Sequence, residues 1–506
     1  VWTKEVFANF MAAKIVHPAF PQINHDLNFL VRHYPGAYGV DRTAGANPIR
    51  QDLANLNLAG QLYGPIIYQK APIMMRQLEQ VLGEAKFRKG MRQYLSTHAY
   101  GNATWPELVD ILDALSDTDL KTWSEVWVNT PGRPEFSTAR RGEQLELLQT
   151  DPADKGRVWP QHFTVRPLSG GSLPIASTAH TTALTTSIAA GSLLLNADGR
   201  GYGLFPANLA QLDNWQELTL LERGSSLVNI YENVLEGRIN PALYLRQLLP
   251  LVRTESEPLL LDLALAHLYR IHTSLLTEAT RKQSLPDIES ALWDTMELSP
   301  DNRRQLYESY SATAQSPPAM VHLKALWTGE LKLQGLTLSE RDRIRLAEIL
   351  ASRLPAEAAA IIATQLQNTR NPDDLRRLQF IAPSLSPDAR TRDAFFASLA
   401  QESNRQTENW VLDGLRNLHH PSRTGLSVRY LGETLALLEE IQVTGDIFFP
   451  GHWLNASLTN HNSDQAVQTV TGFLRQRPDY SPQLRMKILQ AVDLPIRANR
   501  ILAGPP

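Results

Sequence analysis

The sequence predicts a mainly α-helical protein with a small β domain, in three successive segments. Residues 1–134 and 208–506 carry apolar side chains at helical spacing. Residues 135–207 instead form short runs rich in β-branched and aromatic residues, one of which alternates polar and apolar residues. A chain of 506 residues is long enough for several domains. We therefore expect domains at 1–134, 135–207 and 208–506.

The first segment is predicted to consist of amphipathic helices. Its first helix carries apolar residues at helical spacing, namely Val6, Phe7, Phe10 and Met11. Further helices are expected at 23–34, 71–83, 84–101 and 104–116, the last opening with a capping box from Thr104 to Glu107. The stretch from Pro35 to Gly60 is rich in Gly, Asn and Pro, which predicts a long loop.

The second segment is predicted to be a small β-sandwich. "EQLELLQT" alternates polar and apolar residues, and "RVWPQHFTV", "TTALTTSI" and "GSLLLNADGRGYGLF" are short runs of strand-forming residues. "SGGS" and "NADG" supply turns.

The third segment is predicted to be helical throughout. Several helices are expected to start with an N-cap residue followed by proline: Asn240-Pro241, Ser299-Pro300, Asn371-Pro372, Ser386-Pro387 and Ser481-Pro482. The starts are unevenly spaced, so an irregular stack of helix pairs, like a HEAT-type solenoid, fits better than a strict repeat.

The composition excludes several classes of function. A net charge of -3 gives no case for a nucleic-acid partner, and the absence of cysteine excludes disulfides and thiolate metal sites. No run reaches the roughly 20 apolar residues of a membrane helix. The compartment is left open, with a bacterial envelope or periplasm favoured over the cytoplasm. Because a helix begins beside Val1, which is not Met, we expect the natural chain to extend upstream.

Few residues stand out as catalytic candidates. None of the thirteen histidines begins a His-Glu-x-x-His motif. His17, His25 and His33 are eight residues apart and do not share a helical face, so packing roles are favoured for them. Glu5 is a carboxylate at the head of an apolar helix, and its spacing alone favours a first-turn residue that faces the helix dipole. Tyr68 alone is better explained as a buried tyrosine with a satisfied hydroxyl.

Two motifs resemble zinc aminopeptidases of the aminopeptidase N family, within the gluzincins. "WTKEVFANFMA" is similar to the segment that supplies the third zinc ligand, with Trp2, Glu5, Phe7 and Ala8 matching. "LYGPIIYQKAPIMMRQLE" is similar to a Tyr-x-Lys stretch that follows at a similar distance, with Tyr68 and Lys70 matching. The resemblance implies that Glu5 is a metal ligand and that Tyr68 donates a hydrogen bond to the oxyanion of the tetrahedral intermediate.

Further stretches extend the resemblance: "VDRTAGANPIRQ", "WSEVWVNTPGRPEF" and "LLNADGRGYGLF". The implied fold is the helical second half of a thermolysin-like catalytic domain, a β-sandwich and a HEAT-like α-helical domain. The family's two histidine ligands, its general-base glutamate and its substrate-amine loop would precede Val1, so the chain resembles the C-terminal portion of such an enzyme.

The implied function is zinc-dependent removal of N-terminal residues from peptides, with one zinc ion in the full-length enzyme. Residues 1–506 alone are expected to be inactive, because one carboxylate falls short of three protein ligands. Two alternatives stay open: a helical-repeat scaffold that binds partner proteins, and a pseudo-peptidase without the metal histidines. The sequence does not reveal which N-terminal residue of a peptide substrate is preferred, or the oligomeric state.

Overall fold

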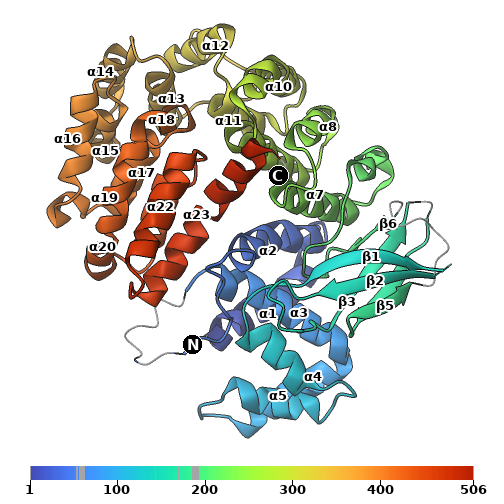
Figure 1. Ribbon diagram of the computed structural model, residues 1–506. Coiled ribbons are helices and arrows are strands. Elements are labelled where there is room, and N and C mark those ends of the chain that lie inside the picture. Colours follow the sequence, from blue (N-terminus) through green and yellow to red (C-terminus); the bar gives the residue numbers. More distant parts are fainter. Residues whose placement is uncertain are drawn as a thin grey trace. The chain divides into compact units, whose positions relative to one another are not determined.

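The structure of the protein is a computed structural model that describes residues 2–52, 55, 63–142, 144–168, 170–184 and 193–504. It is mainly helical with small antiparallel sheets, which confirms the predicted fold class at this level (Figure 1). The chain divides into two compact units, Val1–Ile239 and Asn240–Pro506. We call them the N-terminal unit and the helical unit. The domain boundaries at 134 and 207 stay predictions.

The helices of the N-terminal unit follow the predicted order. Thr104 and Glu107 form the predicted capping box, and Gly83 ends a helix with a φ of 77°, which glycine adopts without strain. No described helix is both long and apolar enough to cross a membrane. The elements are α1 (Trp2–Ala19), α2 (His25–Asp41), η2 (Ile66–Lys70), α3 (Ala71–Leu82), α4 (Glu84–Thr97), α5 (Trp105–Asp113), α6 (Leu120–Ser124), η3 (Glu125–Asn129) and α7 (Leu220–Leu235).

The predicted loop from Pro35 to Gly60 is wrong at its start. Helix α2 continues through Pro35 to Asp41 because Tyr34, Ala37 and Tyr38 are buried in the core. Their burial outweighs the hydrogen bond that proline cannot make. Residues 42–52 and 55 are not helical, and the rest of the predicted loop lies outside the described residues. In α1, Met11 is exposed rather than part of the apolar face.

Within its described residues, the β region forms two three-stranded antiparallel sheets, with strand orders β1-β2-β5 and β4-β3-β6. Its core joins residues of both sheets: the rings of Phe136 and Phe205 stack with centroids 4.4 Å apart, and Phe163 packs edge-on against both. The predicted "NADG" turn is present, and Asn196 bonds to Gly201 across it. The strands are β1 (Glu135–Arg141), β2 (Gln144–Thr150), β3 (Gln161–Pro167), β4 (Leu173–Ser177), β5 (Thr181–Leu184) and β6 (Leu193–Leu194).

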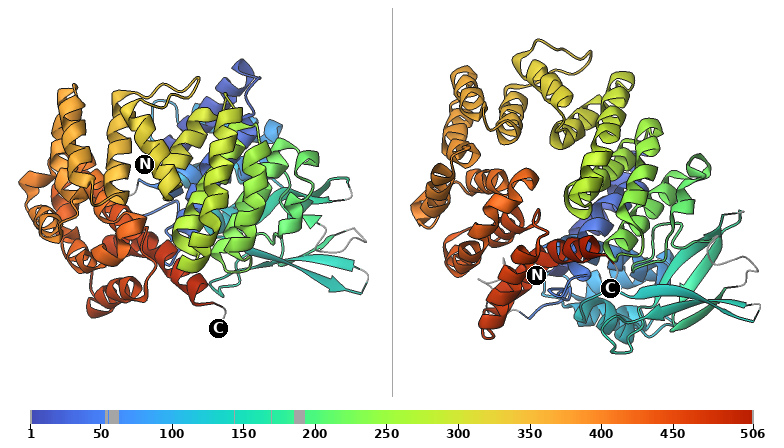
Figure 2. Two further views of the ribbon diagram at one scale, coloured as in Figure 1. Left: turned by 90° about the horizontal axis from the view of Figure 1, so that it is seen from above. Right: turned by 45° about the horizontal axis from the view of Figure 1, so that its top comes forward.

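The helical unit consists of helices that follow one another from green to red in Figure 2. Its longer helices are α8 (Pro241–Thr254), α9 (Pro258–Arg270), α10 (Glu278–Leu298), α11 (Arg303–Thr313), α12 (Pro317–Thr328), α13 (Glu340–Arg353), α14 (Ala358–Asn368), α15 (Pro372–Leu385), α16 (Ala389–Ser398), α17 (Glu408–Leu418), α21 (Phe449–Leu458), α22 (Asp464–Gln476) and α23 (Pro482–Ala503). The short π-helical turn η7 (Ile271–Leu275) follows α9 directly. Short helices α18 (Thr424–Ser427), α19 (Leu431–Ala436) and α20 (Leu438–Thr444) join α17 to α21. The HEAT-type assignment stays a prediction.

The predicted helix starts are partly confirmed. Asn240 and Asn371 cap α8 and α15 through their side chains, and Ser481 precedes α23. The starts at Ser299 and Ser386 are wrong. There the helices begin at Arg303 and Ala389, a few residues beyond the proline. Before Ala389, Asp388 supplies the cap instead, because its carboxylate accepts the backbone N–H of Thr391.

The two ends of the helical unit contact each other. Helix α23 packs against η7, near the start of the unit. The side-chain amide of Asn462 donates a hydrogen bond to the carbonyl of Ser274 (3.0 Å), which strengthens the same junction.

Buried histidines lie at and beside this junction. His272 of η7 is fully buried, and neither ring nitrogen has a hydrogen-bond partner among the described residues. Burial, together with the positive charges of Arg281 and Arg353, lowers the pKa of His272 to about 4. Burial likewise lowers the pKa of His461 to about 4, and this ring lies 2.9 Å from the ring of His419.

We expect the helical unit to lose stability as the pH falls from about 6.5 towards 4, because the unfolded chain protonates these histidines first. Above about pH 6.5 both states are neutral and this stability is fully present. His272→Leu is expected to reduce the loss between about pH 7.5 and 4.5 by about 2–3 kcal/mol. Urea unfolding followed by circular dichroism at the two pH values measures this. An unchanged pH dependence in the variant would contradict it.

Candidate active site

Helix α1 is held against α3–α5 by one buried face. The ring of Trp2 packs on Trp105 with centroids 5.0 Å apart, and Phe10 packs edge-on against Phe87 at 5.6 Å. At the other end of the helix, Lys14 forms an ion pair with Glu79 of α3 (2.6 Å). These contacts fix the position of the helix that carries Glu5.

Glu5 lies in the first turn of α1, beside this buried face. Its side chain is 25% exposed, and its ion-pair partner among the described residues is Lys4, whose Nζ lies 3.5 Å away and is mostly solvated. A pair with so exposed a lysine constrains the carboxylate little. Glu5 is therefore rigidly placed through its helix and still free to accept a further ligand.

Tyr68 lies in η2, a single π-helical turn that leads directly into α3. Ile66, Ile67 and Lys70 of this turn are buried, whereas Tyr68 is half-buried and its ring stacks on Tyr63 with centroids 5.8 Å apart. Such turns recur at functional sites, because the extra residue re-aims a side chain within a helix.

Glu5 and Tyr68, predicted from separate motifs, lie within electrostatic reach of one another. Helix α1 packs against η2. Partial burial, and next the negative charge of Glu5, raise the pKa of the Tyr68 phenol above its usual value. The phenol is therefore a neutral hydrogen-bond donor across the physiological range. The roles assigned to the two residues stay predictions.

A buried ion pair anchors the turn that carries Tyr68. Lys70 and Asp41 are both fully buried, with Nζ 2.6 Å from Oδ2. The remaining bonds join the same pair to Gly132 and Tyr202: Lys70 donates to the Gly132 carbonyl, and Asp41 accepts from the Gly132 N–H and the Tyr202 hydroxyl, each at 2.9 Å. Both charges are thus paired and hydrogen-bonded, as burial requires.

Asp41 is a residue whose importance the sequence does not reveal. It lies in the "VDRTAGANPIRQ" stretch, within the predicted loop, and nothing in its spacing links it to Lys70. The structure instead places it at the end of α2, next to η2.

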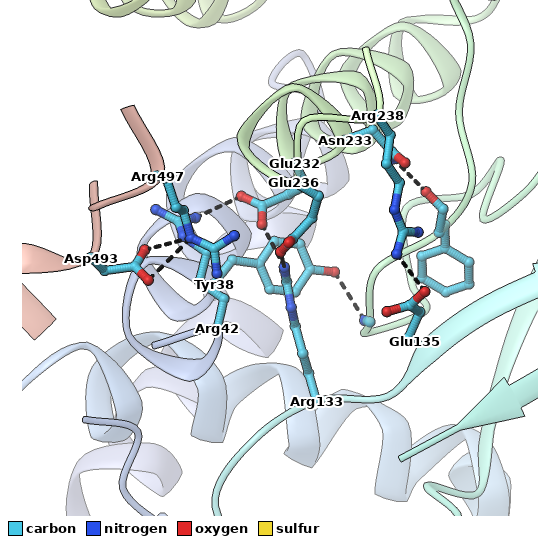
Figure 3. Close-up of polar contacts among 12 residues, drawn as sticks. Tyr38, Arg42, Arg133, Glu135, Glu232, Asn233, Glu236, Arg238, Asp493 and Arg497 are labelled. Atoms are coloured by element: carbon cyan, nitrogen blue, oxygen red, sulfur yellow. Dashed lines mark hydrogen bonds and ion pairs between the residues drawn. The ribbon is translucent and has the colours of Figure 1, made fainter. Parts of the chain in front are cut away.

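The adjoining residues form a second ionic cluster, shown in Figure 3. Glu232 of α7 accepts from Arg42 (2.8 Å) and from Arg133 (2.7 Å), which follow Asp41 and Gly132 in the chain. The guanidinium of Arg133 also lies over the ring of Tyr38, 4.4 Å from its centroid. The end of α2 and the 132–133 turn are thereby fixed from two sides.

Comparison with known proteins identifies the family of this segment. Residues 1–127 match the peptidase family M1 domain. Residues 1–127 therefore carry a segment of a peptidase family M1 domain. This confirms the resemblance that the Glu5 and Tyr68 motifs indicated.

Several curated proteins are similar to the chain. It is 26% identical to the tricorn protease-interacting factor F2 of Thermoplasma acidophilum over 255 residues, which are 49% of this chain and 32% of that protein. It is 28% identical to a leucyl aminopeptidase of Saccharolobus solfataricus over 29% of this chain and 19% of that protein. It is 30% identical to an aminopeptidase N of Streptomyces lividans over 30% of this chain and 19% of that protein. The matches thus span about a third or less of each of these relatives.

The described residues of the chain do not hold a complete metal site. Among them, no group of three His, Asp or Glu side chains is placed to bind a metal ion. The rings of His17 and His25 do stack, 4.0 Å apart, because the chain reverses between α1 and α2. His25 is bonded to the carbonyl of Phe20, which fits the packing role favoured from the sequence. Glu5 fits zinc by its chemistry, as one carboxylate ligand of the three that a catalytic site needs.

Proposed function

We propose that this chain is the C-terminal portion of a zinc aminopeptidase that removes N-terminal residues from peptides. Glu5 is one protein ligand of the metal, and Tyr68 donates a hydrogen bond to the oxyanion that forms at the scissile carbonyl. Zinc, when bound, polarises that carbonyl and lowers the pKa of a bound water. The match of residues 1–127 to the peptidase family M1 domain and the names of the aminopeptidase relatives support this assignment.

The observation that carries the proposal is the pairing of Glu5 with Tyr68. The carboxylate of Glu5 is paired only with an exposed lysine at 3.5 Å, and its helix is held in place by packing. A metal ligand needs such a carboxylate, because a close buried cation would compete with the metal ion for its charge. A phenol with a raised pKa suits an oxyanion donor, because it keeps its proton while negative charge develops nearby.

The two histidine ligands and the general base are proposed to lie upstream of Val1. The family resemblance places their His-Glu-x-x-His motif about twenty residues before Glu5. The coding sequence ahead of Val1 tests this directly. A natural upstream sequence without the motif would overturn the enzyme assignment and leave a pseudo-peptidase.

Zinc content provides the biochemical test. A chain that includes the upstream sequence is expected to bind one zinc per molecule and to cleave aminoacyl amides, whereas residues 1–506 alone are expected to do neither. In the longer chain, Glu5→Gln keeps the size of the side chain but removes its charge, so zinc content should fall well below one per molecule. Elemental analysis after dialysis measures it.

Lys4→Gln is the matched control, because it changes the neighbouring exposed residue by the same number of charges. It should retain zinc and turnover. Full zinc occupancy in the Glu5→Gln chain would remove Glu5 from the proposed ligand set.

A further inference from the structure

The helical unit contains a polar cavity of about 740 Å³ that the proposed peptidase function does not use. It is lined by residues of α13, α15 and α17, which neighbour one another in Figure 1, and by single residues of α9 and α11. The size is typical of pockets for small ligands. All its lining residues belong to the helical unit.

Each carboxylate in the cavity wall already has an arginine partner. Asp374 pairs with Arg341 (3.2 Å), and Asp373 pairs with Arg376. A single guanidinium, Arg377, contacts both Glu348 (2.8 Å) and Asp413 (2.7 Å), and Asp413 also accepts from Arg416 (2.9 Å). Each of these carboxylates is therefore already paired with an arginine of the unit.

Two arginines of the wall have no carboxylate partner. Arg345 is exposed, and its charge acts on Glu348 without a direct ion pair between them, since Arg377 is the direct ion-pair partner of Glu348. Arg353 donates from its two terminal nitrogens to the carbonyls of Ser311 (2.7 Å) and Ala312, and its Nε, buried, lacks an acceptor. The side-chain nitrogen of Asn417 is likewise a buried donor without an acceptor. The cavity thus presents donors and positive charge that the protein itself does not satisfy.

The ionisation of the wall groups reinforces this imbalance. Burial, opposed by Arg377, raises the pKa of Glu348 to about 7, so part of its negative charge is absent at neutral pH. Burial, together with the charges of Arg353 and Arg423, lowers the pKa of His420 to about 3, so this ring is neutral. An incoming anion would therefore meet an excess of positive charge.

The aromatic rings of Tyr269 and Trp410 also line the cavity. We propose that this cavity binds an organic carboxylate, with its charged group at Arg345 and Arg353 and its apolar part against Trp410. A planar guanidinium can donate two parallel hydrogen bonds to a carboxylate, which favours this anion over a spherical one. The proposal concerns a site separate from Glu5 and Tyr68 and does not depend on the peptidase assignment.

Residues 1–506 are sufficient for the test, because it measures binding rather than catalysis. Isothermal titration calorimetry with 3-phenylpropionate is expected to show one site whose affinity falls as salt is added. The matching amide, 3-phenylpropionamide, lacks the charge, and inorganic phosphate lacks the apolar part, so each should bind at least about tenfold more weakly. Equal binding of the amide or of phosphate would overturn the assignment to a carboxylate.

The site itself is tested with Arg345→Gln, which alters an exposed side chain and leaves the internal bonds of the unit intact. It should weaken 3-phenylpropionate binding at least about tenfold. Arg343→Gln on the same helix is the matched control and should change the affinity less than about twofold, since Arg343 does not line the cavity. Trp410→Leu is a second variant and should also weaken binding. If both Arg345→Gln and Trp410→Leu bound 3-phenylpropionate with unchanged affinity, the assignment of the ligand to this cavity would be wrong.

The carboxylate could belong to a small organic acid or to the end of a peptide. A short peptide ending in phenylalanine, with either a free or an amidated C-terminus, separates these sources. Tighter binding of the free peptide than of 3-phenylpropionate assigns the site to peptide termini. Binding of the small acid alone assigns it to small acids, and binding of neither ligand overturns the proposal.

Discussion

Tyr68→Phe, in the full-length enzyme that we propose, is expected to lower kcat about 100- to 1000-fold while zinc stays bound. The substitution removes the phenol oxygen and keeps the ring, so the stacking on Tyr63 is preserved. Loss of one oxyanion donor typically costs about 2.7–4 kcal/mol of transition-state stabilisation. Since the bond forms mainly in the transition state, KM should change much less than kcat.

Tyr63→Phe is the control for this prediction. It removes the same atom from the adjacent ring and should leave kcat within about threefold of the parent enzyme, because surface substitutions rarely exceed ±0.5 kcal/mol. Steady-state kinetics with an aminoacyl-p-nitroanilide, together with elemental analysis, provide the measurements. Near-normal turnover of the Tyr68→Phe enzyme would exclude the phenol from the chemistry.

Lys70→Met is expected to destabilise the N-terminal unit by about 3–5 kcal/mol, because it leaves the Asp41 carboxylate buried without its cation. Asp41 would still accept from Tyr202 and Gly132, but those neutral donors do not replace a charge at 2.6 Å. Urea unfolding followed by tryptophan fluorescence measures the change, since several buried tryptophans lie in this unit.

A double-mutant cycle separates the ion pair from general packing. Asp41→Asn should also destabilise, and the double variant should lose less than the sum of the two single losses. Lys86→Met, which removes an exposed lysine paired with a solvated Asp117, should produce no measurable change. Additive losses at positions 41 and 70 would show that the two charges are not coupled.

The sequence predicted those features of the fold that depend on short-range residue patterns. Helix α3 with Gly83 at its end, the capping box at Thr104 and the "NADG" turn follow from residue spacing and short-range hydrogen bonds. The extension of α2 beyond Tyr34 did not, because it depends on burial of Tyr38 against parts of the chain that no local pattern reveals. The same reason explains the missed partnership of Asp41 and Lys70.

The candidate site was predicted in a different way. Spacing alone made Glu5 an ordinary first-turn residue and Tyr68 an ordinary tyrosine, and only the family resemblance related them. The structure adds the packing of α1 on η2 and the effect of the Glu5 charge on the phenol. The cavity of the helical unit had no signal in the sequence, because its arginines are spread over three helices.

The bond from Tyr202 to Asp41 has a consequence for dissecting the chain. Truncation after residue 134 would delete the Tyr202 phenol. The buried Asp41 carboxylate would then lack one of its hydrogen-bond donors, next to the turn that carries Tyr68. The helices that precede residue 134 should then be recovered as aggregates or as protease-sensitive material. Any smaller expression fragment intended to preserve the surroundings of Glu5 and Tyr68 must therefore retain the following strands through Tyr202.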